Sequence, residues 1–562
     1  MKATLGATRH ELHAAIQRAV AKASANGELS LAGEFRMPSF WVKRAPAGQG
    51  EFASNVALAL ASAARITPQQ VAAILRAHLL SENIWPGDIE EANGFLNFQL
   101  DDPSLANHVT RALTEGARYG AGSTLSGRRI NLEFVSADPT GPLPFAAGRI
   151  AAAGEALCRL LEFQGADVTR EFFLNDVELS PKLHLLGESV AAFYLAAFGR
   201  EGEWPEGALR DNFVRSVAES IVRNEGNVYL LVPEAERTAA FAHRACEAAI
   251  AAQKRTLSAF GVNFDVWASE NALRREGRVS AAIEKLKQRG YTYERDGALW
   301  LRTSAFGDEA DRPLVRANSQ PTYLAADIAY HSFKFERGFD LLLNIWTMEH
   351  RPYAMRTRAA LRAAGCDAER LEVLLCESAR LLRDGRAVIT DKGGGPLTLE
   401  EAMRDIDPET LRFWFLGRDW NEVVEVEIEV ACRDDEANPG YAARLAPARL
   451  GTMIRELEAV PGNAGAMNQP LAATSWSTEE RELLRLVALW PDEAETAAQR
   501  REPQRVARFV TEMAAAVRQL LAESGATVAE SHAPARLQLL RAAQITVSNA
   551  LHLCGVEVRE RF

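Results

Sequence analysis

The strand–helix–strand pattern between residues 129 and 175 constrains the fold of this chain more than any other feature. Residues 129–136, Arg-Ile-Asn-Leu-Glu-Phe-Val-Ser, have the apolar character of a buried strand. A turn follows, then a helix from about Gly148 to Phe163 and a second strand at 167–175. Strands joined by a helix at this spacing form a βαβ unit, so we expect a parallel sheet of the nucleotide-binding type.

A first domain is predicted over residues 1–118. A helix is expected at 9–26. Two more helices are expected to begin near Asn55 and after Thr67, because Thr67-Pro-Gln-Gln supplies a hydroxyl cap and a first-turn proline. Residues 93–100 alternate in the manner of a strand. Three predicted helices and a strand together indicate a small α+β domain.

The βαβ unit belongs to a second predicted domain, residues 119–437. This domain carries a helical insertion near 181–260 and further core strands at 340–346 and 371–375. Residues 438–562 are almost entirely helical in pattern and rich in Ala, Arg and Leu, which predicts a separate bundle. The predicted fold class is α/β, a Rossmann-type domain between an α+β domain and an all-α bundle.

Composition excludes several classes of protein. Hydrophobic residues make up 47% and charged residues 25% of the chain, so disorder is excluded. No apolar run reaches the ~18 residues of a membrane span, and no membrane partner is expected. The six cysteines form no C-x-x-C pair, which predicts a reducing cytoplasm and no metal site. A monomer is the expectation for the oligomeric state.

Ordered sequence motifs carry a family resemblance. Asn131-Leu-Glu-Phe-Val-Ser-Ala-Asp-Pro-Thr-Gly-Pro-Leu, Glu171-Phe-Phe-Leu-Asn-Asp and Thr322-Tyr-Leu-Ala-Ala-Asp-Ile-Ala-Tyr-His resemble segments of the arginine–tRNA ligases, the class I aminoacyl-tRNA synthetases specific for arginine. Gly50-Glu-Phe-Ala-Ser-Asn and the C-terminal helices resemble that family's tRNA-contacting N-terminal domain and its anticodon-binding domain. The resemblance implies a class I synthetase fold, whereas activity depends on the residues of the site.

The first ATP-binding signature that the resemblance implies is missing. Class I synthetases carry His-x-Gly-His after the first strand, where the imidazoles hydrogen-bond the phosphates in the transition state. The matching residues here run from Pro144 to Ala147, followed by the expected Gly148 and Arg149. Each lost donor is expected to cost on the order of 10²–10³ in rate.

The second signature, Lys-Met-Ser-Lys-Arg, is altered as well. Its counterpart is Val388-Ile-Thr-Asp-Lys, followed by three glycines. Asp391 occupies the catalytic lysine position, where its charge repels phosphate, and only Lys392 remains. The alternative interpretation is a flexible glycine loop with no role in catalysis.

A third segment, Thr347-Met-Glu-His-Arg-Pro-Tyr, replaces the family's Gly-Ala-Asp-His-His-Gly-Tyr. Thr347 and Met348 add bulk where small residues admit the nucleotide, while Glu349 and His350 persist as possible contacts. The three changes together predict that ATP activation is lost. No cofactor is firmly implied, and ATP with magnesium is expected only if ligase activity survives.

The residues of the amino-acid pocket persist. Glu133, Tyr323 and Asp327 match family positions that line it, the last two at the guanidinium. A planar guanidinium with five donors favours carboxylates and an aromatic hydroxyl or face. The alternative is a packed, hydrogen-bonded helix start. Asp138 replaces the family's asparagine, and a carboxylate there predicts a preference for esterified over free arginine.

The predicted tRNA-binding residues are fewer than in the family. Asn55 lies in the N-terminal motif, and Tyr441 and Arg449 remain in the helical domain. Arg444 stands where the family has glutamine, and the nearby tyrosine and histidine are replaced. We expect Arg444 to contact phosphate without reading bases, because an aromatic platform is lost.

Three functions remain open from the sequence. The main prediction is a synthetase-like protein that has lost ATP-dependent activation and acts on or senses arginine or arginyl-tRNA, with arginyl transfer from tRNA to an amine as one form. The second is a divergent, active arginine–tRNA ligase. The third is a non-catalytic binding or regulatory protein.

Overall fold

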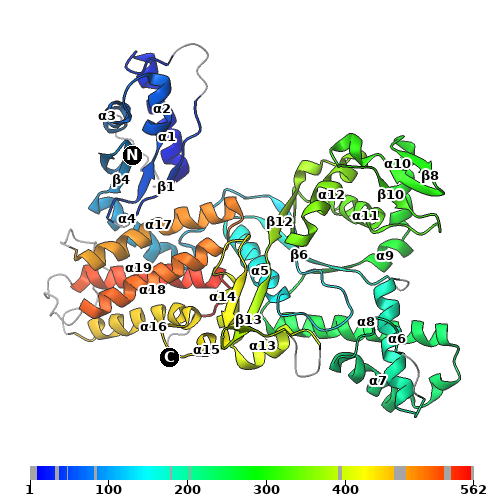
Figure 1. Ribbon diagram of the computed structural model, residues 1–562. Coiled ribbons are helices and arrows are strands. Elements are labelled where there is room, and N and C mark those ends of the chain that lie inside the picture. The colour runs from blue at the N-terminus through cyan, green and yellow to red at the C-terminus, as the bar shows by residue number, and fades with distance from the viewer. Residues whose placement is uncertain are drawn as a thin grey trace.

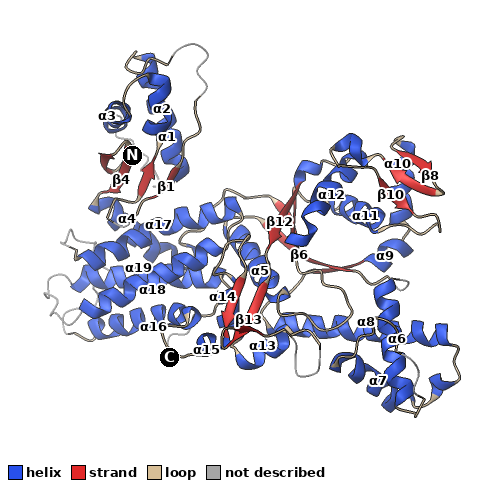
Figure 2. Cartoon of the chain, viewed as in Figure 1, coloured by secondary structure: helices blue, strands red, loops and turns tan. Residues whose placement is uncertain are grey.

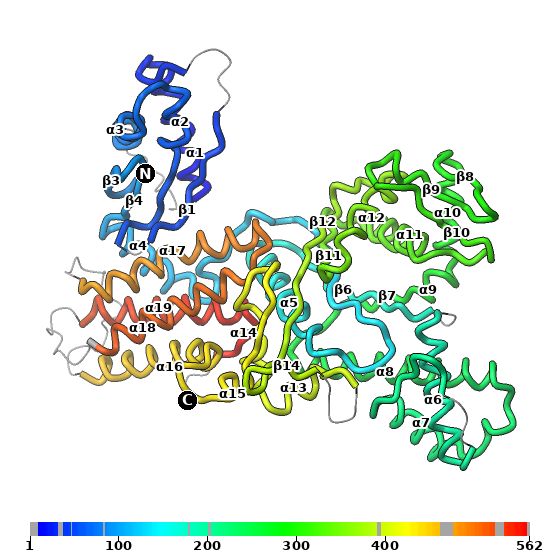
Figure 3. Tube along the Cα trace, in the orientation of Figure 1, coloured from blue at the N-terminus to red at the C-terminus, as the bar shows by residue number. Residues whose placement is uncertain are grey.

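The computed structural model describes residues 9–31, 37–46, 48–81, 85–177, 180–200, 204–389, 395–460, 476–523 and 533–558. The N-terminal domain lies beside one end of a helical bundle, and the central α/β domain joins the bundle's other end (Figure 1). A helical arm formed by residues 181–259 projects from the central domain away from the bundle. Figure 3 traces the same path along the backbone.

The N-terminal domain packs helices against a small antiparallel sheet of order β1-β2-β4-β3. Its elements are α1 (Arg9–Ala25), β1 (Val42–Arg44), β2 (Phe52–Ser54), α2 (Val56–Ala64), α3 (Pro68–Ser81), β3 (Gly87–Ala92) and β4 (Phe95–Leu100). The α3 helix begins where predicted, since the Thr67 hydroxyl accepts from the backbone N–H of Gln70 at 3.3 Å. The helices α4 (Asp102–Glu115) and η1 (Gly116–Arg118) lead to the central domain.

The predicted parallel sheet is confirmed and has the order β12-β11-β5-β6-β7. Its strands are β5 (Arg129–Glu133), β6 (Asp167–Leu174), β7 (Val266–Ser269), β11 (Leu341–Thr347) and β12 (Leu371–Cys376). The helix α5 (Ala147–Phe163) crosses between β5 and β6 and is buried along most of its length. Gly154 is required there, because an added Cβ would lie 2.3 Å from the Phe134 ring.

Helices and small sheets surround the carboxyl edge of this sheet (Figure 2). The predicted insertion consists of α6 (Pro181–Ala196), α7 (Asn212–Glu225), η2 (Val228–Leu230) and α8 (Glu234–Ala259). Between β7 and β12 follow α9 (Glu270–Arg275), α10 (Arg278–Gln288), β8 (Thr292–Arg295), β9 (Ala298–Leu301), η3 (Thr303–Phe306), β10 (Arg312–Val315), α11 (Tyr323–Glu336), η4 (Met348–His350), α12 (Arg351–Ala363) and η5 (Ala368–Arg370).

The chain then connects the sheet to the bundle. The connecting elements are β13 (Ala379–Arg383), β14 (Arg386–Ala387), α13 (Leu399–Asp405), α14 (Pro408–Phe415), β15 (Val424–Glu427) and α15 (Ile428–Ala431). The bundle contains α16 (Pro439–Glu458), α17 (Thr478–Arg500), α18 (Gln504–Glu523) and α19 (Ala533–Leu553). Within the described ranges, no helix has the length and apolarity needed to cross a bilayer.

Candidate active site

A cleft of about 930 Å³ opens at the carboxyl edge of the parallel sheet. It is lined by residues at or after the ends of β5, β6, β11 and β12, by the start of α5, and by α9 and α11. Ligands of open α/β sheets bind at this edge, because the loops that leave neighbouring strands diverge there. The predicted residues Glu133, Asp138, Tyr323 and Asp327 all line this one cleft.

A sharp turn at the end of β5 shapes the cleft floor. Val135 and Ser136 have φ angles of 69° and 41°, and the Ser136 N–H donates to the Phe134 carbonyl at 3.0 Å. A positive φ is costly for a β-branched valine, and such strain concentrates at functional sites. The turn brings the Ser136 hydroxyl to Glu133, to which it donates at 3.2 Å.

Glu133 forms the floor of the cleft and is held by side chains from two other elements. Its Oε2 accepts from the fully buried Lys334 ammonium at 2.6 Å and from the Asn344 amide at 3.0 Å. The same amide donates to His331 Nε2 at 2.9 Å. Burial lowers the pKa of His331 to about 4, so the imidazole is neutral. The Glu133 charge is therefore largely balanced by Lys334.

Asp327 projects from α11 one turn after Tyr323, on the same face of the helix. The Tyr353 hydroxyl, on α12, donates to the Asp327 carboxylate. Burial, followed by the nearby Glu270 and Glu133 carboxylates, raises the pKa of Asp327 to about 7. Among the described residues, no Lys or Arg side chain forms an ion pair with Asp327.

Two other carboxylates that line the cleft, Glu270 and Asp138, have cationic partners. Glu270 accepts from the Arg274 guanidinium at 2.7 Å and 2.9 Å. Asp138 accepts from the Asn175 amide at 3.1 Å and from the Lys182 ammonium. The preference for esters predicted from Asp138 therefore loses its basis, because Lys182 compensates the charge that would repel a free α-carboxylate. Among the described carboxylates that line the cleft, Asp327 and Glu377 form no ion pair with Lys or Arg, and Asp327 is the one that lies beside Tyr323 and Tyr353.

An aromatic wall continues from Asp327 toward the half of the cleft where a nucleotide would lie. The ring of Trp346 is 6.4 Å from that of Tyr353 and 6.3 Å from that of His350, between centroids. His350 Nδ1 and the Thr347 hydroxyl are hydrogen-bonded at 2.8 Å. His350 thus remains at the cleft as predicted, next to the added bulk of Thr347.

The first-signature positions supply no phosphate donor. Pro144 and Ala147 line the cleft, and neither side chain has a polar atom. The N–H groups of Ala147 and Gly148 donate to the carbonyls of Pro144 and Phe145 at 3.0 Å. Three described Lys or Arg side chains line the cleft, Lys182, Arg274 and Arg316, and none of them comes from the first-signature segment or from residues 345–353. These residues do not fit a triphosphate.

Two of the predicted nucleotide contacts belong to the core instead. The Arg149 guanidinium is buried and donates to the carbonyls of Ser378, Asp419 and Glu422, so its prediction as a nucleotide contact is wrong. Gly148 is a packing requirement, because an added Cβ would lie 2.7 Å from Leu399 and 2.8 Å from Phe415.

Four further positions were predicted to lie at the nucleotide site. Met348 and Glu349 are not among the residues that line the cleft, so the bulk predicted at Met348 does not fill it. Asp391 and Lys392 lie outside the described residues.

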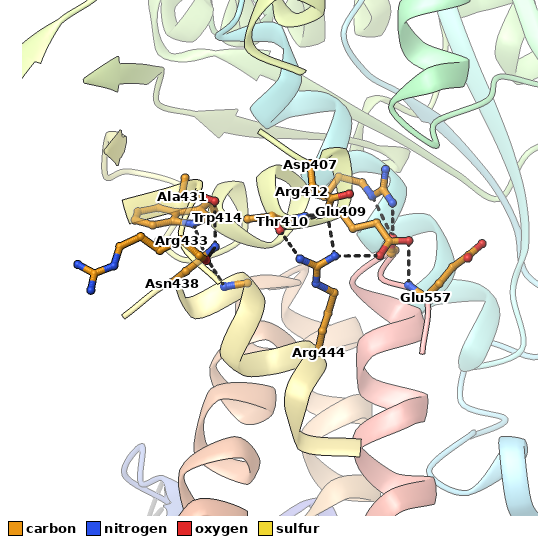
Figure 4. A network of polar contacts seen from close by, with 12 residues as sticks. Asp407, Glu409, Thr410, Arg412, Trp414, Ala431, Arg433, Asn438, Arg444 and Glu557 are labelled. Carbon is orange, nitrogen blue, oxygen red and sulfur yellow. Dashed lines mark hydrogen bonds and ion pairs between the residues drawn. The ribbon is translucent and has the colours of Figure 1, made fainter. Parts of the chain in front are cut away.

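Arg444 is not a phosphate contact, contrary to the prediction. Its guanidinium is buried at the junction of α16 and α14, 3.0 Å from Asp407 and 2.9 Å from the Thr410 hydroxyl (Figure 4). Glu409 lies 3.8 Å away. Two carboxylates and a hydroxyl therefore hold Arg444 as a structural link between the central domain and the bundle.

The remaining tRNA candidates also have internal partners or partial burial. The Asn55 side chain accepts from the Trp41 N–H at 2.8 Å, and Arg449 pairs with Glu436. Tyr441 is half-buried in the first turn of α16. Their predicted contacts with tRNA stay predictions.

Sequence reasoning missed several residues that the cleft brings together, among them Glu270, Arg274, Lys182 and Arg316. Glu270 and Arg274 follow β7, a four-residue edge strand that the pattern did not reveal. Tyr353 stood in the altered third segment, but its role as partner of Asp327 required the fold.

Comparisons with known proteins agree on one family. Residues 10–100 match the model of the arginyl tRNA synthetase N terminal domain, and residues 445–562 match the DALR anticodon binding domain. The arginine–tRNA ligase of Desulfitobacterium hafniense is 36% identical over 555 residues, 98% of each chain. That of Moorella thermoacetica is 36% identical over 563 residues, 99% of each chain.

Solved structures show the same fold. Arginyl-tRNA synthetase of Thermus thermophilus superposes with a TM-score of 0.76 at 20% identity, over 99% of this chain and 100% of that one. The enzyme of Plasmodium falciparum gives a TM-score of 0.72 at 11% identity, over 99% of each chain.

Proposed function

Because this chain belongs to the arginyl-tRNA synthetase family, we propose that it recognises arginine in the cleft and ligates it to tRNA. The observation that carries the proposal is the unpaired carboxylate of Asp327 beside the hydroxyl of Tyr353 and the ring of Tyr323. A guanidinium supplies the charge that Asp327 lacks, and its planar face suits the aromatic residues. Glu133 and Glu270, already balanced by cations, add polar surface around it.

Ligation is supported by the relatives, two of which are arginine–tRNA ligases over essentially their full lengths. Arginine–tRNA ligation requires ATP, with magnesium, to activate the amino acid. The described nucleotide half does not fit a triphosphate, so we derive no catalytic step through it and expect activation to be slow. The binding of tRNA, the monomeric state and the cytoplasmic location stay predictions.

A second candidate is favoured by that lack of phosphate donors. The same pocket serves a protein that binds arginine or arginyl-tRNA without activating the amino acid, either transferring the arginyl group to an amine or acting as a regulator. The specific observation behind this candidate is that Pro144 and Ala147 line the cleft without a polar side-chain atom.

Arginine-dependent exchange of pyrophosphate into ATP, measured with and without tRNA, decides between the two candidates. Exchange above the arginine-free background supports ligation. Its absence, in a folded protein that still binds arginine, rejects ligation and leaves the second candidate. Absence of exchange together with absence of binding to both arginine and arginyl-tRNA rejects both.

Arginine binding is expected to depend on pH through Asp327. Its carboxyl has a pKa of about 7, and only the ionised form pairs with a guanidinium. As pH falls below about 7, bound arginine must displace a proton, so the affinity should fall up to about tenfold per pH unit. Above that pH the affinity should level off. Calorimetry at pH 6 in buffers of different ionisation heat should show proton release on binding, and a pH-independent affinity would contradict this assignment.

A further inference from the structure

Arg316 is the one Lys or Arg lining the described cleft that has no acidic partner. Three such side chains line it, and two of these, Lys182 and Arg274, pair with Asp138 and Glu270. Arg316 is exposed and forms no ion pair or side-chain hydrogen bond with any described residue. In the described cleft, Asp327 is a carboxylate without a cationic partner, and the exposed Arg316 is a cation without an acidic partner.

The segment that carries Arg316 is fixed relative to Asp327. The Arg316 N–H donates to the Gln320 carbonyl, and the Ser319 N–H donates to the Arg316 carbonyl, both at 2.9 Å. Ser319 has a φ of 62°, and Val315 and Pro321 form a bridge that closes the turn. Because Tyr323 begins α11 directly after this turn, the rim and the guanidinium pocket belong to one continuous unit.

Two further polar side chains, Asn318 and Gln320, line the cleft from the same turn. A guanidinium flanked by amides recognises oxyanions well, because it directs two parallel N–H groups at two oxygens. Protein contacts to nucleic-acid phosphates use the same groups.

We propose that Arg316 binds an oxyanion of the ligand whose guanidinium lies at Asp327. This inference rests on the proposed recognition of arginine and assigns a contact to the end of the ligand opposite its guanidinium. The oxyanion is either the α-carboxylate of free arginine or a phosphodiester at the end of an arginylated RNA. Both are compatible with Asp138, because Lys182 compensates its charge.

The test compares Arg316→Gln with Arg295→Gln in the full-length chain. Arg295 is an exposed arginine at the end of β8 that does not line the cleft, so it serves as the matched control. Affinities are measured for arginine, for its methyl ester, and for an acceptor-stem RNA carrying arginine through a 3′-amide. The RNA is titrated at several salt concentrations.

Loss of the Arg316 guanidinium should lower the affinity for the ligand whose oxyanion it contacts roughly tenfold. If the affinity for arginine falls and that for the methyl ester does not, the oxyanion is the α-carboxylate. If the affinity for the RNA falls and its logarithmic salt slope shrinks by about 0.7, the oxyanion is a phosphodiester. Equal affinities in Arg316→Gln and Arg295→Gln for every ligand would overturn the inference. If the unaltered protein binds none of the three ligands, the proposed recognition of arginine has failed instead.

Discussion

Restoring the two missing imidazoles is expected to raise arginine-dependent ATP–pyrophosphate exchange by on the order of 10²–10³ per histidine. The double substitution Pro144→His and Ala147→His places ring N–H groups where the cleft now has only apolar side chains. These donors would stabilise charge that develops at the phosphates in the transition state. The substitutions should therefore raise the rate of exchange and leave the affinity for arginine unchanged.

The matched control is Pro144→Phe with Ala147→Phe, which adds rings of similar size without N–H donors and should not accelerate exchange. Adding Asp391→Lys to the histidine pair removes the repulsive charge at the second signature and should raise the rate further. If the triple variant binds arginine but exchanges no faster than the unaltered chain, missing donors are not what limits activation.

Substituting Asp327→Asn is expected to weaken arginine binding by on the order of 10²–10³-fold, since it leaves the bound guanidinium without its charged partner. The amide keeps the shape of the carboxylate, and the pair with Tyr353 is preserved as a neutral hydrogen bond. Stability should hold or rise, because an uncompensated buried charge is removed. Calorimetric titration with arginine, alongside thermal unfolding, measures both effects.

Asp138→Asn is the control for the loss of a carboxylate in the same cleft. Because Asp138 is already paired with Lys182, its loss should change arginine affinity by less than about tenfold. Equal losses of arginine affinity in Asp327→Asn and Asp138→Asn would show that the guanidinium of arginine does not pair with Asp327.

The sheet and the main helices could be predicted because their signals are local. The apolar run of β5, the helix that follows it and the return strand β6 identify a parallel unit without any knowledge of contacts. The short strands β7, β8 and β9 were not predicted, since a four-residue strand has little periodicity of its own. Glu270 was missed with β7, because its position after a strand end is what brings it to the cleft.

The charge balance of the site could not be read from the sequence. Asp138 and Lys182 are 44 positions apart, and Glu133 and Lys334 are 201 positions apart. Arg444 has the residue type of a phosphate contact, yet its burial against Asp407 and Thr410 assigns it to the core. Residue type indicates which interactions are possible, and only the fold shows which of them the protein already satisfies.

The most direct test of arginine recognition is a calorimetric comparison of arginine with citrulline at pH 8, where Asp327 is ionised. Citrulline has nearly the shape of arginine but carries a neutral urea in place of the guanidinium. Arginine is expected to bind at least roughly 100-fold more tightly, because only its guanidinium pairs with the carboxylate. Equal affinities, or no binding of arginine at all, would contradict the assignment of this cleft.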